Sequence, residues 1–247
     1  SSPLAFVVDT WGWRAGFWIS AAGGVAVALA VFALVPNQPA EHKDHSSPLS
    51  QMIEVLRLGL SRPLRGLIAL ALVSLATSLV LRGLWGGPWL MDVKGLSRIE
   101  AGNQLGAFTL AMIVGPLLIG MIDRRLGRRR ELVAGSHLAG ALLLALMALG
   151  APHFAVSALF GVAVMPPQYD LVLFVLIGLA TSAQPLLFGM SRQLVDAQTA
   201  GKALAAVNLA FFLGTALMQS ITGAVAAFAG LPAVLLFMAA ALLVGVM

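Results

Sequence analysis

Long apolar blocks, separated by short polar stretches, make up most of the chain. Seven blocks reach the length of a membrane-spanning helix, which needs about 20 apolar residues to cross about 30 Å of hydrocarbon. They occupy residues 13–35, 66–89, 101–122, 132–150, 171–190, 203–228 and 231–247. A shorter apolar block at residues 1–8 is interpreted as the end of a further helix. The pattern predicts an all-α fold, a polytopic bundle of transmembrane helices.

Composition supports the membrane interpretation. Of the 247 residues, 60% are hydrophobic and only 10% are charged, against about 25% charged residues in a typical soluble domain. The chain has no cysteine, so disulfides, thiolate metal sites and cysteine nucleophiles are excluded. The net charge of +5 does not indicate a nucleic-acid partner, because the positive residues cluster in loops between the apolar blocks.

The distribution of Lys and Arg between alternate loops predicts the orientation. Eleven of the 15 fall on one side of the predicted spans: Lys43, Arg57, Arg62, Arg65, Arg124, Arg125, Arg128, Arg129, Arg130, Arg192 and Lys202. The opposite side has three, which are Arg14, Lys94 and Arg98, and Arg82 lies within a span. Because cytoplasmic loops carry the excess of Lys and Arg, we expect residues 36–63 to be cytoplasmic.

Residues 36–63 form a polar linker, which divides the chain into residues 1–35, 36–63 and 64–247. Within it, Ser47 and Pro48 are a typical start of a helix. Apolar residues follow at helical spacing: Leu49, Met52, Ile53, Leu56 and Leu60. This helix either lies on the inner membrane face or packs beneath the bundle. His42, Asp44 and His45 are interpreted as part of a solvated linker, so neither a metal nor a cofactor is predicted.

Three stretches together resemble the Major Facilitator Superfamily. Residues 1–21 are similar to the end of the fifth helix, its outer turn and the start of the sixth. The 36–63 linker, followed by six spans, matches the junction between the two six-helix halves of these proteins. The stretch GMIDRRLGRRR, after the second span beyond the linker, is similar to the Gly-x-x-x-Asp-Arg-x-Gly-Arg-Arg signature of the second half.

The signature loop comprises Gly120, Asp123, Arg124, Arg125, Gly127, Arg128 and Arg129. When Gly120, Gly127 and the two following arginines are aligned, the signature's Asp position holds Arg124. Asp123 then lies one residue early, which departs from the arrangement that relays charge to a neighbouring helix end. A tight glycine turn with a cationic cluster remains.

The resemblance implies the C-terminal six-helix half of such a protein, together with the sixth helix of the N-terminal half. Both ends of the chain are apolar, so we expect the remaining N-terminal helices to belong to a longer protein. Residues 82–97 and 201–223 further resemble bacterial drug or metabolite permeases. The implied function is secondary active transport of a small organic solute by alternating access, in a bacterial inner membrane. The resemblance also implies two partners for this chain, which are the lipid bilayer and the missing N-terminal helical half.

Polar side chains inside spans mark a candidate pathway, because they are costly in lipid. At about 100° per residue, Asn208, Thr215, Gln219 and Thr222 fall within about 60° of one another, with Phe212 beside them. They form either a cavity wall or a helix–helix hydrogen-bond seam.

The 66–89 span carries a second polar stripe: Ser74, Ser78, Arg82, Trp85 and Trp89. Arg82 lies about 26 Å beyond Arg65 at helical rise, close to the outer boundary. It either reaches the headgroups there or faces a cavity and attracts an anionic or carbonyl-bearing solute.

In the 171–190 span, Gln184 and Pro185 interrupt the apolar run and predict a bend, either a gating hinge or a fixed kink. His137 is interpreted as a packing residue. No Asp or Glu lies in the middle of a span, so the chain supplies no buried carboxylate for proton exchange. The coupling ion is left open.

Two other classes of function fit the sequence less well than a transporter. A membrane-embedded enzyme needs convergent acid, base or metal groups within the bilayer, and the spans offer only His137. A seven-span receptor or sensor fits the number of spans but not the resemblance.

Overall fold

The computed structural model describes residues 7, 10–36 and 47–246, and these contain helices, turns and short loops but no strand. The chain divides into two compact units, Ser1–Pro48 and Leu49–Met247. The first contains α2 (Trp13–Leu34), a single apolar helix. Most of the predicted stub at residues 1–8, and the His42, Asp44 and His45 cluster, lie outside the described residues. The all-α fold expected from the sequence is confirmed.

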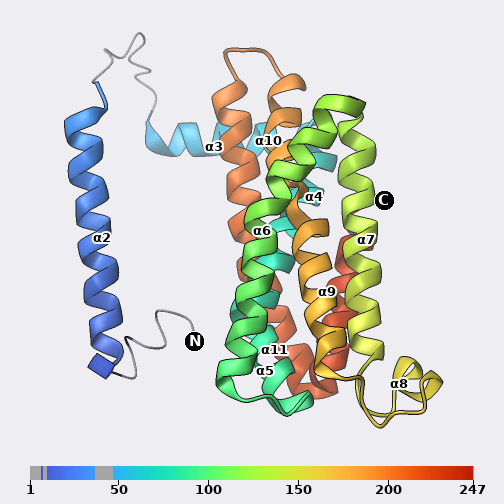
Figure 1. Cartoon of the computed structure of the whole chain (residues 1–247). Coiled ribbons are helices and arrows are strands. Elements are labelled where there is room, and N and C mark those ends of the chain that lie inside the picture. Colours follow the sequence, from blue (N-terminus) through green and yellow to red (C-terminus); the bar gives the residue numbers. More distant parts are fainter. Residues whose placement is uncertain (1–6, 8–9, 37–46, 247) are drawn as a thin grey trace. The chain divides into compact units, whose positions relative to one another are not determined.

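The second unit is a helical bundle (Figure 1). The helices of its apolar spans are α4 (Arg65–Val80), α6 (Arg98–Leu126), α7 (Arg129–Leu149), α9 (Pro167–Ala180), α10 (Gln184–Gln193) and α11 (Ala200–Val246). The other elements are α3 (Pro48–Gly59), η1 (Leu81–Trp85), α5 (Gly86–Pro88), η2 (Trp89–Val93), α8 (Ala155–Leu159) and η3 (Thr181–Ala183). The bundle end that carries α3 and the α6–α7 turn is called the arginine-rich end below.

The described residues contain six helices long and apolar enough to cross a membrane. The longest, α11, has 47 residues and is broken at Gly230, whose φ of 76° is incompatible with a continuing helix. Pro232 follows within the next turn and lacks the N–H that would bond across the break. The helix therefore makes two passes, and each predicted span corresponds to one pass.

The α4 helix packs closely against α11 because a glycine removes the side chain at their crossing. A Cβ atom on Gly214 would overlap the backbone of Leu72. In lipid there is little hydrophobic force between helices, so close backbone approach through small residues supplies much of the contact energy. Gly178 plays the same part where α9 meets α6, because a Cβ atom there would lie 2.9 Å from the Phe108 carbonyl oxygen.

Beyond Val80 the first span of the bundle continues through two π-helical turns, η1 and η2, on either side of α5. Gly86 explains the tight packing here, because a Cβ atom would lie 2.7 Å from both the Leu81 carbonyl oxygen and a methyl of Leu105. Pro88 has no N–H to donate, which widens the helix locally. The span thus reaches Val93 as an irregular helix, a few residues beyond the predicted end.

A buried ion pair closes the bundle end opposite the arginine-rich end. Lys94 Nζ lies 3.0 Å from Asp170 Oδ2, and both side chains are fully buried. Trp89 Nε1 donates to the other carboxylate oxygen at 2.8 Å. Lys94 also donates to the carbonyls of Gly150 and Met165 at 3.0 and 3.3 Å. One ammonium group therefore joins η2, the start of α9 and both ends of the loop that contains α8.

The helix α3 exposes most of its apolar residues. Leu49, Met52 and Leu56 are 45–62% exposed, as is Leu60 in the turn that follows at 77%, whereas Gly59 is buried. An exposed apolar face is typical of a helix that lies at a membrane interface, while Gly59 faces the bundle.

The close crossing at Gly214 generates a stability prediction. Replacing Gly214 with Ala should destabilise the protein by about 1–3 kcal/mol, the usual cost of overpacking, because Leu72 backbone must move. Gly223→Ala on the same helix is the matched control, since open space surrounds that position. Thermal unfolding in detergent, followed by tryptophan fluorescence, measures both. Equal transition temperatures for the two variants would contradict the packing described.

The buried ion pair generates a second prediction. Removing one partner leaves an uncompensated buried charge, so Lys94→Met or Asp170→Asn alone should cost about 3–5 kcal/mol of unfolding free energy. The double variant should lose less than either single variant. Thermal unfolding of the three proteins tests this, with the exposed Arg98→Gln as a control. Additive losses in the double variant would show that the two groups do not interact.

Candidate functional site

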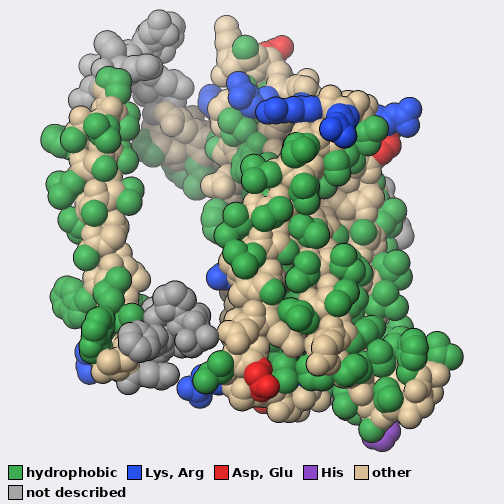
Figure 2. Space-filling model, viewed as in Figure 1, with side chains coloured by type: hydrophobic (Ala, Val, Ile, Leu, Met, Phe, Trp, Pro, Cys, Tyr) green, Lys and Arg blue, Asp and Glu red, His purple; other side chains and the backbone are tan. Residues whose placement is uncertain are grey.

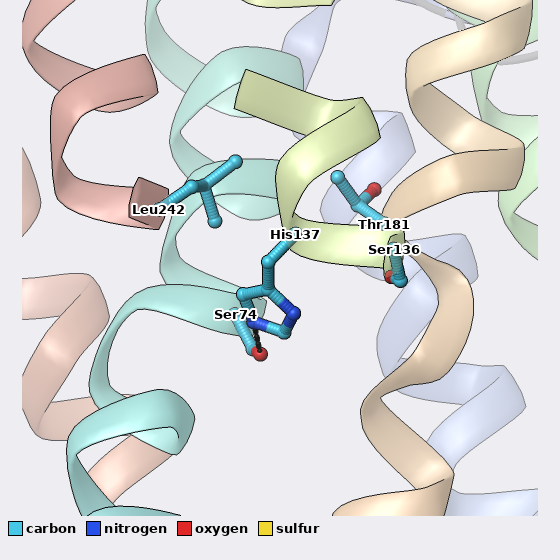
Figure 3. Close-up of a pocket in the computed structure, with 5 residues that line it drawn as sticks. All are labelled: Ser74, Ser136, His137, Thr181 and Leu242. Atoms are coloured by element: carbon cyan, nitrogen blue, oxygen red, sulfur yellow. Dashed lines mark hydrogen bonds between the residues drawn. The ribbon is translucent and has the colours of Figure 1, made fainter. Parts of the chain in front are cut away.

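Polar residues at the centre of the bundle connect α4, α7 and the α9–α10 break. His137 Nε2 lies 2.5 Å from the Ser74 hydroxyl, and its Nδ1 lies 2.7 Å from the Val133 carbonyl. Because a carbonyl only accepts, the Nδ1 atom carries a proton, and a ring protonated there alone accepts the Ser74 hydroxyl at Nε2. Figure 3 shows this pair beside Ser136 and Thr181. His137 thus holds two helices together, as the sequence interpretation expected.

Side-chain hydroxyls donate to backbone carbonyls where α9 gives way to η3 and α10. Pro185 has no N–H, so the Thr181 carbonyl cannot accept the usual bond from four residues further on. The helix passes through the 3-10 turn η3 just before this proline. Ser136 of α7 donates to the Ala180 carbonyl. Thr181 and Ser182 donate to the carbonyls of Ile177 and Gly178 at 2.8 and 2.5 Å. The regular helix is therefore interrupted next to Gln184 and Pro185, where the sequence predicts a bend.

Two predicted pathway residues of α4 take part in the same interior network. Ser78 donates to Thr181 Oγ1 at 2.8 Å. Gln184 Nε2 lies 3.4 Å from the Ser74 carbonyl and from the Ser78 hydroxyl. The space lined by Ser74, His137 and Thr181 has no room for a water molecule (Figure 3). In this conformation these side chains form a seam between helices, and only Gln184 among Ser74, Ser78, Thr181 and Gln184 is more than slightly exposed.

A second group of polar side chains is open to the surroundings. Arg82 is exposed, and its Nε donates to Thr109 Oγ1 of α6 at 2.8 Å. Trp85, one turn further along, donates its indole N–H to Thr222 of α11 at 2.8 Å. Thr109 was not singled out from the sequence; only its hydroxyl within an apolar run could have drawn attention to it.

The polar stripe predicted on α11 divides into two parts. Thr215 and Thr222 are buried and donate to carbonyls of their own helix at 2.8 and 2.6 Å. Asn208, Phe212 and Gln219 are exposed, and Phe212 has 59% of its surface accessible. The stripe therefore follows the border between the packed and the open face of α11.

Arg82 and Gln219 occupy equivalent depths. Each lies three residues before one partner of the Trp85–Thr222 hydrogen bond, on helices that run in the same direction. Both are exposed. The name polar face is used below for these two residues together with Thr109, Asn208 and Phe212, five residues contributed by η1, α6 and α11.

The signature loop forms a tight turn at the arginine-rich end, and its acidic residue Asp123 is buried. Gly127 ends α6 in the left-handed conformation, with φ of 64°. The turn places Arg129 Nε 2.9 Å from Asp123 Oδ2, and Asp123 is only 9% exposed. Arg124, at the aligned acidic position, is exposed. Asp123 is therefore the inward-facing acid of the loop, although it lies one residue early in the alignment.

The loop also borders another helix. A hollow of 370 Å³ is lined by Asp123, Arg124, Gly127, Arg129 and Gln193 of α10. The second carboxylate oxygen of Asp123 is buried without a hydrogen bond among the described residues. Arg125 and Arg128 are exposed, and Gly120 lies on α6 two turns before the cap.

The surface of the bundle has the distribution of apolar and basic side chains expected of a membrane protein. In Figure 2, hydrophobic side chains cover the visible side of the bundle, and Lys and Arg gather at the arginine-rich end. Among the described residues, no group of three or more His, Asp or Glu side chains could hold a metal ion.

Comparison with known families gives one result. The sequence model of the Major Facilitator Superfamily matches residues 3–169 and, in a second overlapping match, residues 88–247. A search of curated proteins gave no match. The two matches span nearly the whole chain, and the bundle has the apolar helices that the family requires. The chain therefore belongs to the Major Facilitator Superfamily of membrane transporters and is an integral, multi-pass membrane protein.

Proposed function

We propose that the chain is part of a secondary active transporter that moves a small organic solute by alternating access. The polar face forms one wall of the pathway. The observation that carries this proposal is the exposure of Arg82, Asn208 and Gln219 on spans whose other exposed side chains are mainly apolar. A cation and two amides facing lipid would be costly, so they are expected to face water, solute or another part of the protein.

The residues of the polar face suggest the class of solute. A guanidinium and two amides offer several donors together with amide oxygen acceptors, and Phe212 adds an aromatic surface. Such a wall suits an organic anion or a carbonyl-bearing molecule with an apolar part. A second helical half, as the family resemblance implies, would supply the facing wall, since the bundle alone does not enclose the polar face.

In the proposed mechanism three interior residues affect the pathway through the hydrogen bonds they make within the bundle. They are Ser74, Ser78 and Gln184. They lie in the interior seam beside the α9–α10 break. If the break is the gating hinge, their hydrogen bonds hold the present conformation and exchange partners when the helix bends differently. Gln184 is half-buried, so it is the member of the seam best placed to contact a solute.

We further propose that the arginine-rich end faces the cytoplasm, in a bacterial inner membrane. Arg124, Arg125, Arg128 and Arg130 are exposed there, and the positive-inside rule assigns such loops to the cytoplasmic side. The described spans carry Asp and Glu only near their ends, as with Asp123 and Asp170. Proton exchange would then depend on carboxylates of the second helical half.

Substitution of Arg82 tests the proposed function. In cells expressing the transporter, a panel of small organic solutes first identifies one whose accumulation depends on the protein. Arg82→Ala should then reduce its transport about tenfold or more, because a hydrogen bond to a charged group contributes about 1.5–3 kcal/mol. Arg82→Lys should retain most of the activity, since the charge remains.

Arg98→Ala is the matched control, an exposed arginine at the start of α6 away from the polar face. Surface expression of each variant is measured in parallel. Equal transport by Arg82→Ala and Arg98→Ala would contradict the assignment of the polar face to the pathway.

A further inference from the structure

An apolar groove lies between α3 and the arginine-rich ends of α4 and α11. Its volume is 190 Å³. All three helices contribute side chains to it: Leu56, Leu60, Ile68, Leu72, Leu209 and Leu213. None of these residues belongs to the polar face or to the interior seam, so the proposed transport function does not account for the groove.

Two contacts between α3 and α11 are made by small or charged residues, and they leave room for the groove. Gly59 packs against Ala206, and a Cβ atom on the glycine would lie 3.4 Å from the alanine Cβ. Glu54 and Lys202 form an ion pair one turn and a half away. Ala206 and Ala210 line the floor, where larger side chains would fill the space. The two helices are thus held together with a gap between their leucines.

The groove extends from the membrane interface into the hydrocarbon. Leu72 lies about 10 Å beyond Arg65 at helical rise, while Leu60 lies in the turn before α4. Its lining is almost entirely apolar. Because water gains no hydrogen bonds from such walls, the molecules that fit are hydrocarbon chains.

Three arginines lie close in sequence to the residues that line the groove. Arg57 on α3, and Arg62 and Arg65 in and after the turn to α4, are all exposed. The nearby acid Glu54 is paired with Lys202 and so does not neutralise them. Clustered arginines beside a membrane surface attract anionic headgroups, and a guanidinium can bind a phosphate through two hydrogen bonds.

We propose that the groove binds an acyl chain of an anionic phospholipid of the adjoining leaflet, with the lipid phosphate on Arg57, Arg62 and Arg65. The apolar face of α3 continues the wall of the groove and stays exposed, as expected for a helix that rests among lipids. The bound lipid fills the gap between α3 and the bundle and so fixes the linker helix against α4 and α11.

Native mass spectrometry of the purified protein tests this, by titration with phosphatidylglycerol or phosphatidylcholine carrying identical acyl chains. The first phosphatidylglycerol should bind at a concentration about tenfold lower than the first phosphatidylcholine, because of the arginines. Replacing all three, as Arg57→Gln, Arg62→Gln and Arg65→Gln, should abolish this preference. Equal binding of the two lipids to the unmodified protein would overturn the proposal.

The groove itself is tested by filling it. Leu213→Trp places a larger side chain in the groove at a residue 49% exposed, and should weaken the first phosphatidylglycerol about tenfold. Leu217→Trp, at a residue 50% exposed on the same helix but outside the groove, should bind like the unmodified protein. Equal lipid binding by the two variants would overturn the site, as would a photo-crosslinker at Leu213 that captures another protein segment instead of lipid.

Discussion

The absence of water from the bilayer core is the constraint on which the structure depends. Every polar group in a span must find a partner within the protein or face a water-filled space, since lipid offers no hydrogen bonds. The backbone meets this requirement by forming helices. Where the regular helix is interrupted, side chains add hydrogen bonds to the backbone, as the Ser136 hydroxyl does at the Ala180 carbonyl. The same requirement explains why Lys94 and Asp170 are buried only as a pair with further hydrogen bonds.

The constraint also separates two kinds of polar residue that look alike in the sequence. Ser74, Ser78 and His137 are satisfied by one another and by neighbouring helices, and they hold the bundle around the α9–α10 break. Arg82 and Gln219 are exposed at equivalent depths. In the proposed mechanism a transporter needs both kinds: an interior whose hydrogen bonds hold one conformation at a time, and an open polar surface that solute can contact. On α11 the two kinds of polar residue lie side by side: Thr215 is buried, whereas Asn208 is exposed.

The sequence predicted the spans well because crossing a bilayer demands long apolar runs, and even the break near Gly230 was marked by residues 228–231. It could not predict contacts that depend on tertiary packing. Lys94 and Asp170 are far apart in the chain, and each looked like an ordinary residue near a span end. Counting alignment positions put Arg124 at the acidic site, whereas the left-handed turn at Gly127 brings Arg129 to Asp123. The polar stripe of α11 is partly buried and partly exposed, because its 60° width lies across the edge of the packed face. Periodicity alone cannot show where that edge lies.

The central claim is that the polar face of α11 meets water while the neighbouring face meets lipid. The chain has no cysteine, so single cysteines placed along α11 can be labelled in membranes with a water-soluble thiol reagent and compared with the same protein without the added cysteine. Cysteines replacing Asn208, Phe212 and Gln219 should react rapidly, whereas those replacing Leu217 and Ile221 should remain protected. Equal reactivity along the helix, or faster reaction at Leu217 and Ile221, would contradict the account.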